Sequence, residues 1–187
     1  MQTMIHQQSK RKLELVHSDV CGPLQVESIG GSRYFITFID DYSRCVRSFY
    51  QAQTEVFEKF KHFEAMVTKE CGESIRKLRT DNGASICKDF QTYLTSKGIE
   101  HKLTVPHSPQ QNGVAERLNR ILMESARAML SHANLPKKLW AEAVATAAYI
   151  RNHTITSVNG EQLTPFENGM ATNPTRSEEH TSELQSL

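Results

Sequence analysis

Three acidic residues stand in three well-separated polar segments of this chain. They are Asp19 in Val16-His17-Ser18-Asp19, Asp81 in Arg79-Thr80-Asp81-Asn82-Gly83, and Glu116 in Gln110-Gln111-Asn112-Gly113-Val114-Ala115-Glu116-Arg117. Two hard divalent cations held close together need acidic oxygens from separate parts of a chain, because waters and substrate phosphate complete their coordination shells. We therefore expect a fold that brings these segments together as a two-metal phosphoryl-transfer site.

The residue pattern predicts a series of strands around these acids. Apolar and β-prone runs favour strands over 13–19, 33–40, 45–50, 75–80 and 99–105. The first would end at Asp19 and the fourth at Asp81. Asp41-Tyr42-Ser43-Arg44 reads as a turn, which predicts an antiparallel hairpin from the second and third strands.

Apolar residues at spacings of three and four predict helices over 54–71, around 90–98, from about 114 and from about 136. The helix from 114 would carry Glu116. Two prolines and Gly113 predict a loop over 106–113. The last helix would bury the apolar residues of its inner face, which are Leu139, Trp140, Ala143, Val144, Ala147 and Ile150. The element order indicates an α/β fold, a mixed sheet with helices on both faces.

The bulk composition fits one globular domain. The chain has 187 residues, of which 38% are hydrophobic, and a net charge of +1. It has no apolar run long enough for a membrane span and no secretory signal, so we expect nuclear or cytoplasmic residence without a membrane. Its four cysteines form no C-x-x-C pair, so reduced thiols are expected rather than a zinc site.

Four segments are predicted along the chain. Residues 1–12 form a polar linker, 13–153 the core, and 154–175 a C-terminal extension. Residues 176–187 match the conceptual translation of a sequencing-adapter oligonucleotide, so we interpret them as an artefact without function.

The core resembles the catalytic domain of a copia-type retrotransposon integrase. The resemblance rests on four motifs in order: His17-Ser18-Asp19-Val20-Cys21-Gly22-Pro23, Asp40-Asp41-Tyr42-Ser43-Arg44, Arg79-Thr80-Asp81-Asn82-Gly83, and Pro106 through Arg120. It implies a ribonuclease H-like mixed sheet of about five strands. It also implies that Asp19, Asp81 and Glu116 bind two Mg²⁺ or Mn²⁺ ions and catalyse 3′-end processing and strand transfer of DNA. DNA and a second copy of the chain, as a homodimer or higher oligomer, are the implied partners.

Candidate DNA-binding residues lie beside Glu116. Gln110, Gln111, Asn112 and Gly113 would border the catalytic site as hydrogen-bonding groups of the loop, followed by Arg117 and Arg120. Arg120 suits a phosphate clamp, but Glu116, Arg120, Glu124 and Arg127 also form a helical charge ladder. Both interpretations stay open.

Other residues have plainer interpretations. Asp40 and Asp41 fit a hairpin turn better than a metal site, and His17 fits a hydrogen-bonded core residue, although it shares a side with Asp19. Trp140 is expected in the core. Members of the resembled family also carry an upstream His/Cys zinc-binding segment, which this chain lacks, so a DNA-binding or dimerising remnant without catalysis is one alternative. A hydrolytic nuclease for RNA–DNA hybrids is another.

Overall fold

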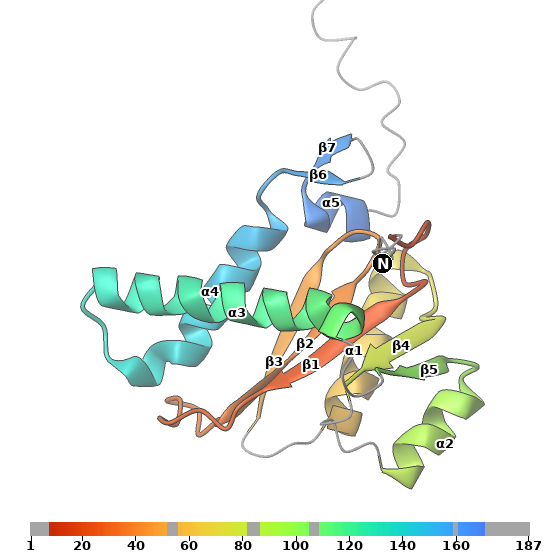
Figure 1. Cartoon of the computed structure of the whole chain (residues 1–187), viewed down its shortest axis with the longest axis horizontal. Coiled ribbons are helices and arrows are strands. Elements are labelled where there is room, and N and C mark those ends of the chain that lie inside the picture. The colour runs from red at the N-terminus through yellow and green to blue at the C-terminus, as the bar shows by residue number, and fades with distance from the viewer. Residues whose placement is uncertain (1–7, 52–55, 82–86, 105–108, 159–160, 171–187) are drawn as a thin grey trace, which may run out of the picture.

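A five-stranded mixed sheet forms the centre of the molecule. The computed structural model describes residues 8–51, 56–81, 87–104, 109–158 and 161–170. The sheet has the order β3-β2-β1-β4-β5 and comprises β1 (Val16–Cys21), β2 (Tyr34–Asp40), β3 (Val46–Gln51), β4 (Lys77–Thr80) and β5 (Glu100–Leu103). β1, β2 and β3 pair antiparallel, whereas β4 pairs parallel with both β1 and β5. The predicted hairpin and mixed sheet are confirmed (Figure 1).

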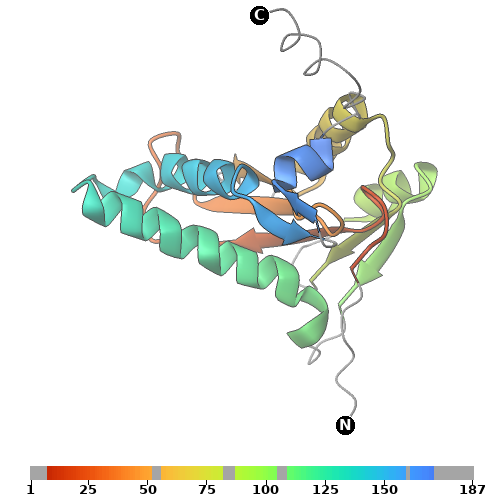
Figure 2. The ribbon, with the colours of Figure 1, turned by 90° about the horizontal axis from the view of Figure 1, so that it is seen from above.

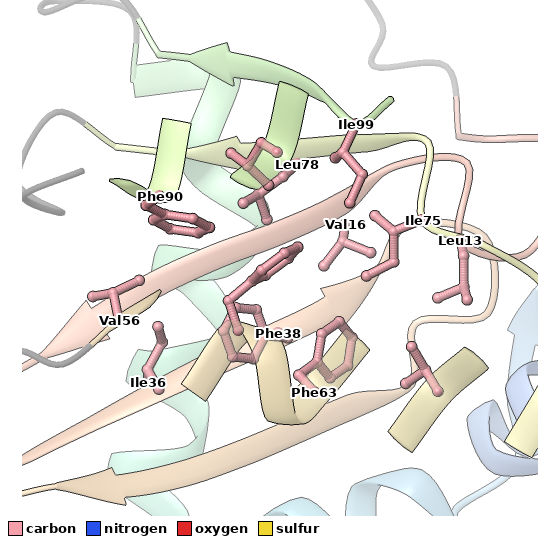
Figure 3. Packing of buried hydrophobic residues seen from close by; sticks show 13 residues of the cluster. Leu13, Val16, Ile36, Phe38, Val56, Phe63, Ile75, Leu78, Phe90 and Ile99 are labelled. Carbon is pink, nitrogen blue, oxygen red and sulfur yellow. The ribbon is translucent and has the colours of Figure 1, made fainter. Parts of the chain in front are cut away.

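Helices cover both faces of this sheet, as predicted. α1 (Val56–Cys71) and α2 (Lys88–Ser96) pack on one face through a cluster of apolar residues that includes Val16, Phe38 and Leu78 (Figure 3). α3 (Pro109–His132) and α4 (Trp140–Asn152) pack on the other face around Phe35, Ile39 and Leu122 (Figure 2). A short 3-10 helix, η1 (Lys137–Leu139), precedes α4. None of the helices in the described ranges combines the length and apolar composition that a membrane crossing requires.

β1 extends past the point predicted for its end. The strand continues to Cys21, so Asp19 lies inside it rather than at its terminus. The break comes at Gly22, whose φ is +141° and where a Cβ would lie 2.7 Å from the carbonyl oxygen of Arg33. Only glycine fits this backbone without strain. The predicted strand end was therefore wrong because Val20 continues the alternation.

α3 begins before its predicted start. The structure is helical from Pro109, so the predicted loop over 106–113 is wrong for residues 109–113. Proline is favoured at the first helical position, because it has no N–H to leave unpaired there, and the glutamines that follow are good helix formers. Residues 105–108 lie outside the described ranges.

The buried face of α4 is close to the predicted one, but Ile150 is 52% exposed. The helix instead buries Asn152, whose side-chain amide accepts a hydrogen bond from the Val46 nitrogen at 2.9 Å and donates one to the Val46 carbonyl oxygen at 2.8 Å. This pair of bonds orients the last turn and leaves Ile150 on the outer side. Trp140 is buried, as expected.

The C-terminal extension contains structure that the apolar pattern did not predict. β6 (Thr156–Val158) and β7 (Glu161–Leu163) form an antiparallel pair, followed by α5 (Pro165–Met170). A capping box begins α5: the Thr164 nitrogen donates to Glu167 at 3.0 Å, and the Glu167 nitrogen donates to the Thr164 hydroxyl at 3.1 Å. α5 packs beside α1 and α4, with Gly169 close to Ser43 and Cys45.

Candidate active site

Asp19 lies two residues before the end of β1, and its side chain points toward α3. The alternation along β1 places Val16 and Val20 in the core beneath α1, and Cys21 in the core beneath α3 and α4. Asp19 shares the side of Cys21 and accepts a hydrogen bond from Asn119 of α3 at 2.9 Å. His17 and Asp19 were predicted to lie on one side of the strand, and this arrangement agrees with that prediction.

Asp81 directly follows β4, the parallel neighbour of β1. His17 pairs with Arg79 in the β1–β4 register, so Asp19 and Asp81 each lie two residues beyond this pair, and the charge of Asp81 acts on Asp19. Neighbouring strands are about 4.8 Å apart, and residues level with each other in a parallel pair project to the same face. The predicted position of Asp81 at a strand end is confirmed. The Asn82-Gly83 turn expected after it lies outside the described ranges.

Glu116 lies on the second turn of α3, where the helix crosses the face that carries Asp19. Ala115, Leu118 and Leu122 bury the inner side of the helix, and Glu116 is exposed beside them. Asn119, one turn later, bonds to Asp19. The helix therefore brings Glu116 to the same side of the sheet as Asp19.

The electrostatics of Asp19 reflect its acidic neighbours. Burial raises the pKa of Asp19 to about 6, with Asp81 and, to a smaller extent, Glu116 adding to the increase. The hydrogen bond from Asn119 acts in the opposite direction. Negative charge is thus concentrated at one place, and a nearby cation would relieve it.

These carboxylates form a donor set that suits Mg²⁺ or Mn²⁺, since hard cations prefer carboxylate oxygens. In the described residues, no three His, Cys, Asp or Glu side chains are gathered closely enough to coordinate one ion. Asp81 is half-buried and Glu116 is exposed, and three like charges in one place repel one another. The acids thus share a face and interact electrostatically without forming a closed cage.

Asn119 and Thr37 belong to this site although the sequence interpretation did not single them out. The Thr37 hydroxyl donates to the Asn119 side-chain oxygen at 2.8 Å, and the Asn119 side-chain nitrogen donates to Asp19. One signal was present: Asn119 is a polar residue within a helical stripe whose other members are apolar. Buried amides need hydrogen-bond partners, so such a residue points to a polar neighbour.

The candidate DNA-binding residues lie on the first three turns of α3. Gln110, Gln111 and Asn112 form helical backbone, and their side chains are outside the description. Gly113 is half-buried, whereas Arg117 and Arg120 are exposed. The alternative charge ladder does not form: among the described residues no ion pair joins Glu116 to Arg120 or Glu124 to Arg127. His107 lies outside the described ranges.

Asp40 and Asp41 have structural partners in the β2–β3 turn. Asp40 accepts hydrogen bonds from the nitrogens of Leu13 at 2.9 Å and Ser43 at 3.0 Å, and from the Ser43 hydroxyl at 2.7 Å. Asp41 pairs with Arg44 at 3.2 Å and with buried His17. The interpretation of both acids as turn residues, and of His17 as a bonded core residue, is confirmed. Cys21, Cys45, Cys71 and Cys87 form no disulfide in the structure.

The chain is similar to known integrase domains and Pol polyproteins. The family profile of the integrase core domain matches residues 9–109, a range that includes Asp19 and Asp81. The chain is 48% identical over 151 residues, 78% of its length, to the retrovirus-related Pol polyprotein from transposon TNT 1-94 of Nicotiana tabacum. It is 32% identical over 160 residues, 85% of its length, to that from transposon RE2 of Arabidopsis thaliana. The chain spans 11% of the length of each of these relatives.

Two solved structures share the fold. A simian T-cell lymphotropic virus intasome, solved in complex with PP2A regulatory subunit B56 gamma, matches 96% of this chain and 65% of its own with a TM-score of 0.67 at 21% identity. The HTLV-2 integrase catalytic core domain, solved with magnesium in a trimeric form, matches 84% of this chain and 96% of its own with a TM-score of 0.58 at 20% identity. The sheet is therefore that of a ribonuclease H-like fold.

Proposed function

Because this chain belongs to the integrase core domain family, we propose that residues 13–153 form a metal-dependent polynucleotidyl transferase core of a retrotransposon Pol polyprotein. Its reactions are the processing of DNA 3′ ends and their transfer into target DNA. The observation that carries this proposal is the electrostatic coupling of Asp19, inside β1, with Asp81, directly after the parallel neighbour β4, and with Glu116 on α3.

The metal ligands in this proposal are Asp19, Asp81 and Glu116, which would hold two Mg²⁺ or Mn²⁺ ions. Their oxygens are the hard donors that these cations prefer. The pKa of Asp19 is raised mainly by burial and further by the charges of Asp81 and Glu116, as for a buried carboxylate with acidic neighbours. When bound, such a cation pair lowers the pKa of the attacking hydroxyl and neutralises charge on the leaving oxygen. Support also comes from the HTLV-2 catalytic core domain, whose structure was solved with magnesium.

The reaction is an in-line displacement at phosphorus. In end processing a water oxygen forms the new P–O bond, and in strand transfer the 3′-hydroxyl of the element DNA does. In both, the bond from phosphorus to the 3′ oxygen of the cut strand breaks, and that oxygen takes up a proton. The attacking oxygen comes from water or from the DNA itself, so no covalent enzyme intermediate is needed. The number of phosphodiester bonds is conserved in strand transfer.

The DNA contacts in this proposal come from the start of α3. Arg117 and Arg120 are exposed on the helix that carries Glu116. Guanidinium groups bind phosphate strongly. Gln110, Gln111, Asn112 and Gly113 add amide and backbone groups at the helix N-terminus, where the helix dipole favours an anion.

A disintegration assay on a Y-shaped DNA tests the proposal with the full chain and Mg²⁺ or Mn²⁺. Glu116→Gln keeps the shape of the side chain but removes its charge, and should reduce strand joining by about 100-fold or more, the scale of losing one electrostatic group in a catalytic site. Glu124→Gln is the matched control, since Glu124 is an exposed acid two turns further along α3. Equal activity of the wild-type and Glu116→Gln proteins would refute the assignment.

The alternatives give different outcomes in the same experiment. Salt-dependent DNA binding without any metal-dependent product would identify a binding remnant. Preference for an RNA–DNA hybrid over duplex DNA would identify a hydrolytic nuclease. The proposal also includes assembly into a homodimer or higher oligomer, which sedimentation measures, and action inside the cell, in the cytoplasm or nucleus.

A further inference from the structure

A buried chain of hydrogen bonds joins two strands of the sheet to α3 behind the acidic site. Thr37 of β2 donates to the side-chain oxygen of Asn119 at 2.8 Å, and the Asn119 nitrogen donates to Oδ2 of Asp19 at 2.9 Å. Thr37 is fully buried and Asn119 is 5% exposed. Thr37 is also the register partner of Asp19 across β1 and β2, so the two side chains lie on one face.

Asp19 and Thr37, at the two ends of this series of hydrogen bonds, determine how the Asn119 amide is oriented. An ionised carboxylate only accepts hydrogen bonds, so the amide nitrogen of Asn119 must face Asp19. The amide oxygen then faces Thr37, whose hydroxyl is able to donate. Without that hydroxyl the amide oxygen is buried without its donor, and nothing on that side prevents the amide from rotating. Thr37 therefore holds the orientation of Asn119 without touching Asp19.

The same bonds connect α3 to the strand that carries Asp19. Asn119 follows Glu116 by three residues, so the two lie on neighbouring positions of the helix surface. A bond from Asn119 to β1 and another to β2 oppose rotation of the helix and sliding along the sheet. The position of Glu116 relative to Asp19 thus depends on Asn119.

We propose that Thr37 and Asn119 are positioning residues that aim the Asp19 carboxylate and set the register of α3, so that Asp19 and Glu116 can ligate a divalent cation together. The inference rests on the proposed function. The Asp19 carboxylate accepts hydrogen bonds from Asn119 and from the Val20 backbone, and its other lone pairs are available to a ligand. Thr37 acts only through Asn119.

A double-mutant cycle tests this arrangement through Mn²⁺ binding, measured by electron paramagnetic resonance of free Mn²⁺ with the full chain. Thr37→Val keeps the shape of the side chain and removes the donor, whereas Thr37→Ser keeps the donor. We expect about 10-fold weaker Mn²⁺ binding for Thr37→Val, the lower end of the range for residues that orient metal ligands, and near wild-type binding for Thr37→Ser. Asn119→Ala should weaken binding at least as much.

The variant that combines Thr37→Val with Asn119→Ala gives the most discriminating measurement. If Thr37 acts through Asn119, Thr37→Val has no further effect when Asn119→Ala is already present. Additive losses, or wild-type affinity in Thr37→Val, would overturn the inference. If Thr37→Val does not fold, which circular dichroism reports, Asn119→Ala decides alone: unchanged Mn²⁺ affinity overturns the inference.

Different Mn²⁺-binding results would overturn the proposed function itself. A wild-type protein that binds no Mn²⁺, or an Asp19→Asn protein that binds it equally well, overturns the metal site and the inference together. Loss of Mn²⁺ binding in Asp19→Asn with full binding in Thr37→Val and Asn119→Ala overturns the inference alone.

Discussion

His17 donates a hydrogen bond from Nε2 to Oδ1 of Asp41 across 3.0 Å, and neither side chain is exposed to solvent. The bond joins β1 to the β2–β3 turn, at the opposite end of the strand from Gly22. The Ser9 nitrogen donates to the other oxygen of Asp41 at 2.7 Å, and Arg44 pairs with Asp41 as well. This carboxylate therefore organises one end of the sheet, while Asp19, two residues after His17, belongs to the acidic site.

Removal of the Asp41 carboxylate should strongly destabilise the fold. Burial alone would raise the pKa of Asp41, but the bonds from His17 and Ser9 and the charge of Arg44 hold it well below its usual value. We expect Asp41→Ala to lower the free energy of unfolding by about 3–5 kcal/mol at pH 7, as for other broken buried pairs. Because the folded pKa is depressed, this stabilisation is present above about pH 4 and is lost as the pH falls through the folded pKa.

Urea unfolding at pH 7 and pH 3 measures this difference. Glu58→Ala is the control, because the exposed pair of Glu58 with Lys61 should contribute less than about 1 kcal/mol. Equal losses in the two variants at pH 7 would contradict the structural role given to Asp41.

Neutralising Asp19 should stabilise the metal-free protein. Its pKa is raised to about 6, so the associated stability is present below about pH 4 and is lost as the pH rises through 6. Asp19→Asn should therefore be more stable than wild type by about 1–3 kcal/mol at pH 7.5, and the two should converge near pH 4. Urea unfolding in EDTA tests this; a less stable Asp19→Asn protein at pH 7.5 would contradict it.

Divalent cations should raise the melting temperature of the wild-type protein. At a Mn²⁺ concentration about ten times Kd, binding adds about 1.4 kcal/mol, which corresponds to about 3–6 °C in Tm for a domain of this size. Asp81→Asn should lose this increase, and Glu124→Gln should keep it. Differential scanning fluorimetry with and without EDTA decides, and an equal increase in Asp81→Asn would argue against Asp81 as a ligand.

Gly169→Ala should weaken the packing of α5. A Cβ at this position would lie 2.8 Å from the Ser43 hydroxyl oxygen and 3.0 Å from the Cys45 Cβ. Inserting a methyl group there should lower the free energy of unfolding by about 1–3 kcal/mol. Gly113→Ala is a matched control in stability measurements, since a Cβ there meets nothing within 4 Å and alanine should stabilise α3 by about 0.5–1 kcal/mol. Stability unchanged in Gly169→Ala would show that α5 adjusts freely.

Much of the fold was predictable because its core segments have clear periodicity. β2 is a continuous run of β-prone residues that is buried on both faces, and the buried residues of α1 recur at three and four. The wrong predictions concerned the ends of elements, where a single residue determines the boundary. Gly22 ends β1, and Pro109 begins α3. The capping box of Thr164 and Glu167 was a visible signal for α5, but six residues are too few for an apolar period.

The site was predictable only in part. Asp19, Asp81 and Glu116 stood out because their motifs resemble a family, and the structure places them on one face. Thr37 did not stand out, since a buried threonine is ordinary in a strand and its role depends on Asn119, which is 82 residues away. Contacts of that kind depend on how α3 crosses the sheet, which local patterns do not determine.

The bonds between Asn152 and Val46 also affect how the molecule meets other copies of itself. β3 is an outermost strand, and its outward N–H and C=O groups are a template on which another chain can add a strand. The Asn152 amide supplies the donor and the acceptor that a foreign peptide would offer at Val46. A side chain of α4 thereby blocks sheet extension at the start of β3, so association through this edge must begin elsewhere along the strand.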